Sequence, residues 1–244
     1  MDEQKRLKGK TILITGAARR LGRAMAIAVA EEGANVVIHY GKSQEEAEEV
    51  ADKVRELGTQ AWVFCRDLGN LNKVESFIDE VLQITPINAL VNNAAIFENR
   101  NIYETDLDTW QRHIDIIFTS AYILSKNFAK NYENDDGRIV NILDWRALQP
   151  VTDHFAYTMA KAGLAAMTRS LALTFAPRIS VNGIALGAIL APSDNIHNDN
   201  IIENVPLKRW SKISEVTQTL LFLLSGSGYI TGNIIHVDGG RLIL

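Results

Sequence analysis

The chain has 244 residues, of which 47% are hydrophobic, and its net charge is −4 at pH 7. This composition provides for a large core, argues against a disordered chain, and gives no sign of a basic face for nucleic acid. Cys65 is the single cysteine, which excludes an internal disulfide and favours a reducing, cytoplasmic location. The charged N-terminus and the lack of a long apolar run predict neither a signal peptide nor a membrane span.

The first predicted strand, residues 11–14, leads into a glycine-bearing turn. An alanine-rich stretch over residues 23–32 predicts the helix that follows. Backbone N–H groups at the start of such a helix, helped by its dipole, receive phosphate, and Gly16 and Gly22 allow close approach of the backbone. The alternative for this segment is an ordinary turn between a strand and a helix.

A second strand is predicted over residues 34–40, followed by a helix over residues 44–57. In a dinucleotide-binding fold, the end of this strand meets the adenosine ribose. An acidic residue there favours a free 2′-hydroxyl, whereas a basic one accommodates a 2′-phosphate. The chain offers Lys42 and Ser43 and no carboxylate, and Arg20 adds a second positive charge. This pattern favours NADP(H) over NAD(H), although Lys42 could also be a solvated loop residue.

The remaining elements continue the alternation of strands and helices. Strands are predicted at 61–65, 89–91, 139–143, 179–184 and 233–237, and helices at 70–82, 107–132, around Tyr157, and at 214–224. The alternation predicts one α/β domain over residues 1–244, a doubly wound Rossmann-type fold with a seven-stranded parallel sheet and helices on both faces. Residues 187–206 are predicted to form a mobile loop over the substrate site.

Tyr157 and Lys161 are four residues apart, so a helix places them on one face. An ammonium group near a tyrosine favours the phenolate and lowers its pKa from about 10, and such a pair can give a proton to a substrate near neutral pH. Asp144 ends the fifth strand and could bring a carboxylate to the same cleft. A tyrosine and a lysine at this spacing are nevertheless common by chance.

Small residues at 92–95 follow the fourth strand and would let a flat ring lie against the backbone. Phe97 comes just after them, and the pattern alone favours a place in the core for it.

These segments together resemble the short-chain dehydrogenase/reductase family over nearly the whole chain. The resemblance rests on Thr15-Gly16…Gly22, Asp67, Asn92-Asn93-Ala94, Tyr157-x-x-x-Lys161, Val181-Asn182 and Val237-Asp-Gly-Gly240. It implies an enzyme whose NADP(H) is bound by a set of residues along the chain: Gly16, Arg20, Leu21, Tyr40, Lys42, Ser43, Asp67, Leu68, Asn93, Ala94, Tyr157, Lys161, Gly187 and Ile189.

Within that family, three features look like the pteridine reductases and the related dihydromonapterin and dihydrofolate reductases. Arg20 stands in the phosphate loop, Asp144 replaces the usual catalytic serine, and Phe97 lies where those enzymes stack a pterin ring. The resemblance implies NADPH-dependent reduction of a pterin-like small molecule without a metal. Tyr157 would supply the proton, assisted or merely oriented by Asp144, and Lys161 would hold the nicotinamide ribose. The substrate contacts would be Arg20, Phe97, Asp144 and Tyr157.

The sequence also departs from the family pattern. Ile117 stands near the position of an asparagine that usually supports a water beside the lysine, Leu186 replaces a proline, and Ala95 replaces a serine. Two alternatives therefore stay open. One is a reductase of a 3-oxoacyl thioester, a sugar or a small ketone, which the missing serine disfavours. The other is a non-catalytic NADP(H)-binding sensor, which Ile117 would permit.

The resemblance further implies a homotetramer or homodimer. It would be built on the helix around residues 106–132 and the Tyr157 helix, with the C-terminal strand at a second interface. These helices have apolar residues available beyond those needed to cover the sheet: Ile116, Ile117, Phe118, Leu164 and Met167.

Overall fold

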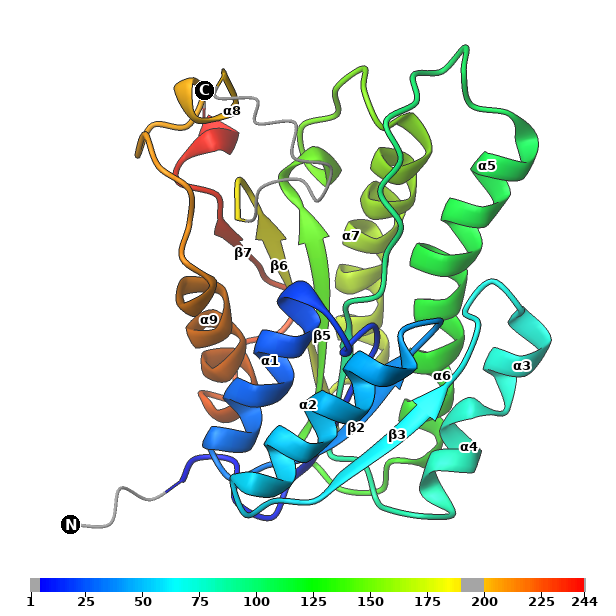
Figure 1. The fold of residues 1–244 in the computed structure, drawn as a ribbon, viewed down its shortest axis with the longest axis vertical. Coiled ribbons are helices and arrows are strands. Elements are labelled where there is room, and N and C mark those ends of the chain that lie inside the picture. The colour runs from blue at the N-terminus through cyan, green and yellow to red at the C-terminus, as the bar shows by residue number, and fades with distance from the viewer. Residues whose placement is uncertain (1–4, 190–199, 244) are drawn as a thin grey trace.

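The computed structural model describes residues 5–189 and 200–243. Within them the chain forms one seven-stranded parallel sheet in the order β3-β2-β1-β4-β5-β6-β7, with helices on both faces (Figure 1). Helices α1, α2 and α9 pack on one face, and α4, α6 and α7 pack on the other. The predicted fold class is confirmed.

The strands are short and mostly buried, as expected for a parallel sheet covered on both faces. All four residues of β1 and all but one of the six residues of β2 are buried. The strands are β1 (Thr11–Ile14), β2 (Asn35–Tyr40), β3 (Ala61–Cys65), β4 (Ala89–Asn92), β5 (Gly137–Asp144), β6 (Ile179–Leu186) and β7 (Ile234–Val237).

The helices follow the strands in the alternation that the sequence predicts. They are α1 (Arg20–Glu31), α2 (Gln44–Glu56), α3 (Leu71–Glu75), α4 (Phe77–Leu82), α5 (Leu107–His113), α6 (Ser120–Asn131), α7 (Phe155–Phe175), α8 (Asn200–Glu203) and α9 (Ile213–Ser225). A π-helical segment, η1 (Ile114–Thr119), joins α5 to α6, and two short 3₁₀ turns are η2 (Trp145–Ala147) and η3 (Arg241–Ile243). No helix in the described ranges is both long and apolar enough to cross a bilayer.

Two helical predictions need correction. The helix expected over residues 70–82 is interrupted at Ser76, which ends α3 and begins α4. The Ser76 hydroxyl contacts the Lys73 carbonyl at 3.5 Å and the Glu80 carboxylate at 2.7 Å, and serine side chains of this kind compete with the helical backbone pattern. The stretch over residues 107–132 is helical but contains the π-helical segment η1, which the periodicity of the sequence does not predict.

The predicted loop over residues 187–206 is only partly covered, because residues 190–199 lie outside the described residues. Its described end contains the short helix α8, and the mobility of this loop stays a prediction.

The order in which the chain adds strands to the sheet changes sides at β1. Strands β2 and β3 lie on one side of β1, and β4 to β7 lie on the other. In open parallel sheets, ligands bind in the crevice outside the carboxyl ends of the strands at such a point. Thr15 and Asn93, the residues just after β1 and β4, are joined there: the Asn93 side chain donates to the Thr15 carbonyl at 2.8 Å, and the Asn93 backbone N–H donates to the Thr15 hydroxyl at 2.9 Å. The fold therefore fixes where a dinucleotide site is to be sought.

Candidate functional site

The predicted site residues come together because nearly all of them follow the carboxyl end of a strand. Gly16 follows β1, Asp67 follows β3, Asn93 and Ala94 follow β4, and Gly187 and Ile189 follow β6. Tyr40 and Asp144 are the last residues of β2 and β5. Parallel strands bring all these positions to one edge of the sheet.

The turn between β1 and α1 is built for a close backbone approach. Gly16 has a φ of +63°, and a Cβ on Gly22 would lie 2.0 Å from the Gly16 carbonyl oxygen. Arg20, the first residue of α1, has a φ of +50°, a strained value for a residue other than glycine. Strain of this kind is typical of ligand-binding segments.

The N-terminus of α1 has no side-chain cap. Arg19 occupies the N-cap position and makes no capping hydrogen bond, and no acidic residue stands in the first turn. In contrast, α3 and α5 are capped by the side chains of Asn70 and Asp106. The first N–H groups of α1, including that of Leu21, are therefore placed to receive an anion.

The segments expected to meet the adenosine half of a dinucleotide lie beside this turn. Tyr40 and Leu68 are buried, whereas Lys42 and Asp67 are exposed, and Ser43 precedes α2 without capping it. The β2–β3 pairing places Tyr40 opposite Cys65, so these segments adjoin at the sheet edge. Lys42 is thus available to a phosphate group.

Tyr157 and Asp144 form the centre of the site. Tyr157 is 7% exposed on the first turns of α7, and its hydroxyl donates to Oδ2 of Asp144 at 3.2 Å. Burial, followed by the negative charge and the hydrogen bond of Asp144, raises the pKa of Tyr157 well above its ordinary value. This corrects the expectation that Lys161 lowers that pKa. A neighbouring carboxylate and loss of solvent both disfavour the phenolate.

Lys161 lies on the same face of α7 and is only 2% exposed. Its ammonium group donates to the carbonyl of Ile142 at 2.5 Å, and it lies 5.8 Å from the centre of the Tyr157 ring. Burial lowers the pKa of Lys161 to about 8, a shift that Asp144 partly opposes. The lysine is thus a desolvated cation within reach of the tyrosine ring.

Asp144 is an acceptor in all its described contacts. One oxygen, Oδ2, takes the Tyr157 hydroxyl, while Oδ1 accepts the backbone N–H of Arg146 at 2.8 Å and lies 3.7 Å from its guanidinium. The Arg146 guanidinium also makes a bidentate pair with Asp153, donating one hydrogen bond to each carboxylate oxygen at 3.2 and 3.0 Å. Two accepted hydrogen bonds and a nearby guanidinium therefore surround the Asp144 carboxylate. This arrangement favours an orienting role for Asp144 over a donating one.

Phe97 is 52% exposed, so it is a rim residue of the site and the core alternative is wrong. Its ring stacks on His154 with centres 3.8 Å apart and meets Tyr157 edge-on at 4.7 Å. The guanidinium of Arg146 lies 5.6 Å from the same ring. A flat substrate that contacts Tyr157 would therefore meet Phe97 as well.

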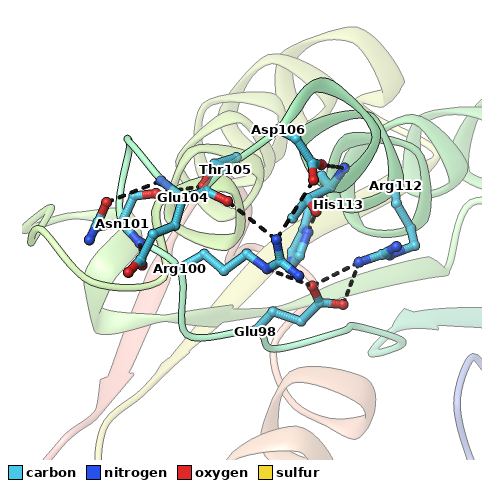
Figure 2. Close-up of polar contacts among 9 residues, drawn as sticks. Glu98, Arg100, Asn101, Glu104, Thr105, Asp106, Arg112 and His113 are labelled. Carbon is cyan, nitrogen blue, oxygen red and sulfur yellow. Dashed lines mark hydrogen bonds and ion pairs between the residues drawn. The ribbon is translucent and has the colours of Figure 1, made fainter.

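The loop after Phe97 is fixed by ion pairs (Figure 2). Both oxygens of Glu98 accept from Arg112, at 2.6 and 2.7 Å, and Asp106 caps α5 by accepting from Thr109 at 2.7 Å. The carbonyl of Arg100 accepts the N–H of Phe155 at 2.8 Å, which ties the loop to the start of α7. These contacts set the position of Phe97 relative to the helix that carries Tyr157.

Three functional neighbours were missed by sequence reasoning: Arg146, His154 and His39. Arg146 and His154 lie in the irregular segment between β5 and α7, where no periodicity predicts which side chains meet Phe97 or Asp144. His39 did carry a signal, because an ionisable side chain directly follows the apolar run Val36-Val37-Ile38.

The sequence departures have visible structural settings. Ile117 lies within η1, is buried, and packs in one apolar cluster with Tyr157 and Ala160. Ala95 is exposed beyond β4, and Leu186 ends β6 opposite Asp144. Arg20 is exposed at the start of α1.

Comparisons with known proteins agree with this geometry. A family model described as enoyl-(acyl carrier protein) reductase matches residues 16–241. A 3-oxoacyl-[acyl-carrier-protein] reductase of Synechocystis is 31% identical over 97% of this chain and 98% of its own. The crystal structure of the FolM alternative dihydrofolate reductase 1 of Brucella canis, complexed with NADP, is 33% identical with a TM-score of 0.89, covering 98% of this chain and 96% of that one. A short-chain dehydrogenase of Burkholderia cenocepacia in complex with NADP is 30% identical with a TM-score of 0.91, covering 97% and 99%.

Proposed function

Because this chain belongs to the short-chain dehydrogenase/reductase family, we propose that it is an NADPH-dependent reductase of a pterin-like substrate of the dihydropterin, dihydromonapterin or dihydrofolate class. The observation that carries the proposal is the cluster of Asp144, Tyr157 and Phe97, in which a carboxylate replaces the usual hydroxyl beside the tyrosine and an aromatic ring flanks it.

The residues present fit the dinucleotide. The uncapped start of α1 and the close contact between Gly16 and Gly22 suit a pyrophosphate. Lys42 is exposed beside the end of β2, where a 2′-phosphate would lie. NADP is named in the structures of the Brucella and Burkholderia neighbours, which supports NADP(H) for this chain.

When bound, NADPH supplies the hydride, and the protein's own residues manage the proton. The raised pKa of Tyr157 keeps its hydroxyl protonated, so it serves as the proton donor at its Oη atom. Asp144 holds that hydroxyl by accepting its hydrogen bond, and Lys161 provides positive charge that offsets the developing phenolate. Phe97 would stack on a flat ring, which contributes about 1 kcal/mol beyond burial.

A second candidate is reduction of a 3-oxoacyl thioester, which the 31%-identical Synechocystis relative favours. Such chemistry needs a donor near the carbonyl oxygen in addition to Tyr157. Asp144 accepts hydrogen bonds in all its described contacts, so it does not supply that donor. The pterin reading is therefore preferred.

The experiment is a substrate panel with wild-type protein and an Asp144→Ser variant. NADPH oxidation is followed with dihydropterins, dihydrofolate, quinonoid pterin and an acetoacetyl thioester. We expect wild-type turnover of a pterin, and a loss of roughly 10²–10⁴ in the variant because Tyr157 loses the group that holds it. NADPH affinity should change little, since Asp144 lies at the end of β5, away from the phosphate turn after β1. Tyr157→Phe should abolish turnover of either substrate class.

Each outcome separates the candidates. Pterin reduction by Asp144→Ser at the wild-type rate would remove the main support for this function. Wild-type turnover of the thioester alone would select the second candidate, and tight NADPH binding without turnover of any substrate would select a non-catalytic sensor.

A further inference from the structure

His39, the second-last residue of β2, joins the segments that follow β1 and β3. It is 2% exposed. The backbone N–H of Gly16 donates to its ring Nδ1 at 3.0 Å, and the N–H of Ala17 donates to its backbone carbonyl at 2.9 Å. On the other side, ring Nε2 lies 2.9 Å from the carbonyl of Arg66. One residue therefore links two loops that are far apart in the sequence.

These partners determine the protonation state of the ring. A backbone N–H can only donate, so Nδ1 of His39 must be the unprotonated nitrogen. A backbone carbonyl can only accept, so Nε2 must carry the hydrogen. Both sides require the same neutral tautomer. Burial, together with the positive charge of Arg66, lowers the pKa of His39 to about 4, so the ring stays neutral over the physiological range.

The surroundings of the ring keep it in place. Phe77 of α4 lies 5.5 Å from it, and the Arg66 guanidinium lies over the same Phe77 ring at 5.4 Å while pairing with Glu80. The described chain places no carboxylate in hydrogen-bonding contact with the imidazole.

His39 and a bound pyrophosphate would therefore use different backbone N–H groups of the phosphate turn. His39 takes the N–H groups of Gly16 and Ala17, which leaves the donors at the uncapped start of α1 to receive a pyrophosphate. Through the Arg66 carbonyl, the same ring fixes the backbone just before Asp67, on the adenosine side.

We propose that His39 is a positioning residue for the dinucleotide, whose neutral Nε2–H imidazole sets the phosphate turn in register with the adenosine-side segment at Arg66–Leu68. This inference rests on the NADP(H) binding in the proposed function. The buried His39 ring acts through its contacts with Gly16 and Arg66.

The test compares three substitutions that separate the two ring contacts. In His39→Asn the side-chain oxygen can replace Nδ1 as acceptor for Gly16, in His39→Gln the side-chain nitrogen can replace Nε2 as donor to Arg66, and His39→Leu removes both. Dissociation constants for NADPH and NADH are measured by calorimetry on each variant. We expect His39→Leu to weaken both cofactors by about the same factor, of the order of tenfold, because both contain the pyrophosphate. His39→Asn should recover most of this loss, and His39→Gln should recover little.

Lys42→Ala provides the matched control. It should weaken NADPH by about tenfold and leave NADH unchanged, since only NADPH carries the 2′-phosphate. A loss in His39→Leu that is confined to NADPH would overturn the positioning role, as would unchanged binding of both cofactors.

A measurement on wild-type protein covers the case in which a variant does not fold. Nitrogen-15 shifts of the His39 ring at neutral pH should show an unprotonated Nδ1 and a protonated Nε2, and the opposite tautomer would overturn the inference. Failure of the wild-type chain to bind either dinucleotide would instead overturn the proposed function, and the inference with it.

Discussion

The ammonium group of Lys161 is buried, and this burial affects how activity should depend on pH. Its pKa is lowered from 10.5 to about 8 by burial, so it loses its proton as pH rises through about 8. The raised pKa of Tyr157 places the tyrosine's own titration above this range. Loss of positive charge beside Tyr157 removes the support for the developing phenolate.

We therefore expect kcat/KM for the reductase reaction to fall as pH rises through about 8. Arginine keeps its charge over the whole range, so in Lys161→Arg the residual activity should lose this basic limb. Profiles of kcat/KM against pH for both proteins, with saturating NADPH, provide the measurement. A wild-type profile that stays flat to pH 10 would assign the charge of Lys161 no part in the reaction.

Sequence reasoning at the residue scale succeeded where a residue type stands directly after a strand. The positions of Gly16, Asn93 and Asp144 followed from parallel pairing alone, because strand ends meet at one edge. It failed for the pKa of Tyr157, since the spacing to Lys161 shows a neighbouring cation but not the desolvation that outweighs it. Arg146 and His154 were missed because an irregular segment of ten residues, 145–154, has no period from which their contacts could be read.

At the scale of elements, α1 and the turn before it are fitted to each other at Gly22. Alanine normally stabilises a helix over glycine by about 1 kcal/mol. At Gly22 alanine should instead destabilise the protein, because the added Cβ would lie 2.0 Å from the Gly16 carbonyl oxygen and 2.9 Å from the Asn93 side chain.

Gly22→Ala should lower the free energy of unfolding by about 1–3 kcal/mol, the usual range for overpacking. Thermal melting of the cofactor-free protein measures it, and about 2–4 °C per kcal/mol is expected for a chain of this size. Gly41→Ala is the control, since a Cβ at Gly41 would have nothing within 4 Å. Equal melting temperatures for the two variants would show that α1 moves away from the turn without penalty.

The π-helical segment η1 is an element that sequence periodicity could not predict. It has helical backbone angles at its ends and continues the buried stripe of α5 and α6, so residue spacing predicts one unbroken helix. It places Ile117 against Tyr157 in a shared apolar cluster, and π segments of this kind occur frequently at functional sites. The family's asparagine at this point would bring a polar group to the same place.

At the scale of the whole molecule, the outer face of α6 and α7 bears on the predicted self-association. Ile117 and Leu164, counted in the sequence as available for an interface, are buried within the chain, because Ile117 packs beside Tyr157 and Leu164 joins the same cluster. Tyr122 on α6 is 45% exposed, and Phe118 is half-buried against Gly163 of α7. A smaller apolar surface than predicted therefore remains for a partner.

We still expect a dimer or tetramer, and light scattering at micromolar concentration should give the mass of two or four chains. Tyr122→Glu should weaken this assembly, because it places a charge on the proposed contact face. Ile84→Glu is the control, since Ile84 is exposed in the segment that follows α4. A single-chain mass for the wild-type protein would contradict the prediction.

The central position of β1 has a consequence for how the protein is made. Residues Thr11–Ile14 leave the ribosome well before β4, yet β4 is one of their two flanking strands, and its Ala89 pairs with Ile12. Until Ala89 has been synthesised, the nascent chain holds a strand whose last three residues are apolar and one side of which lacks hydrogen-bond partners. Such open edges are templates for pairing between chains. A translation product that ends before residue 89 should consequently aggregate or be degraded. A product that reaches the end of β4 contains both strands that pair with β1.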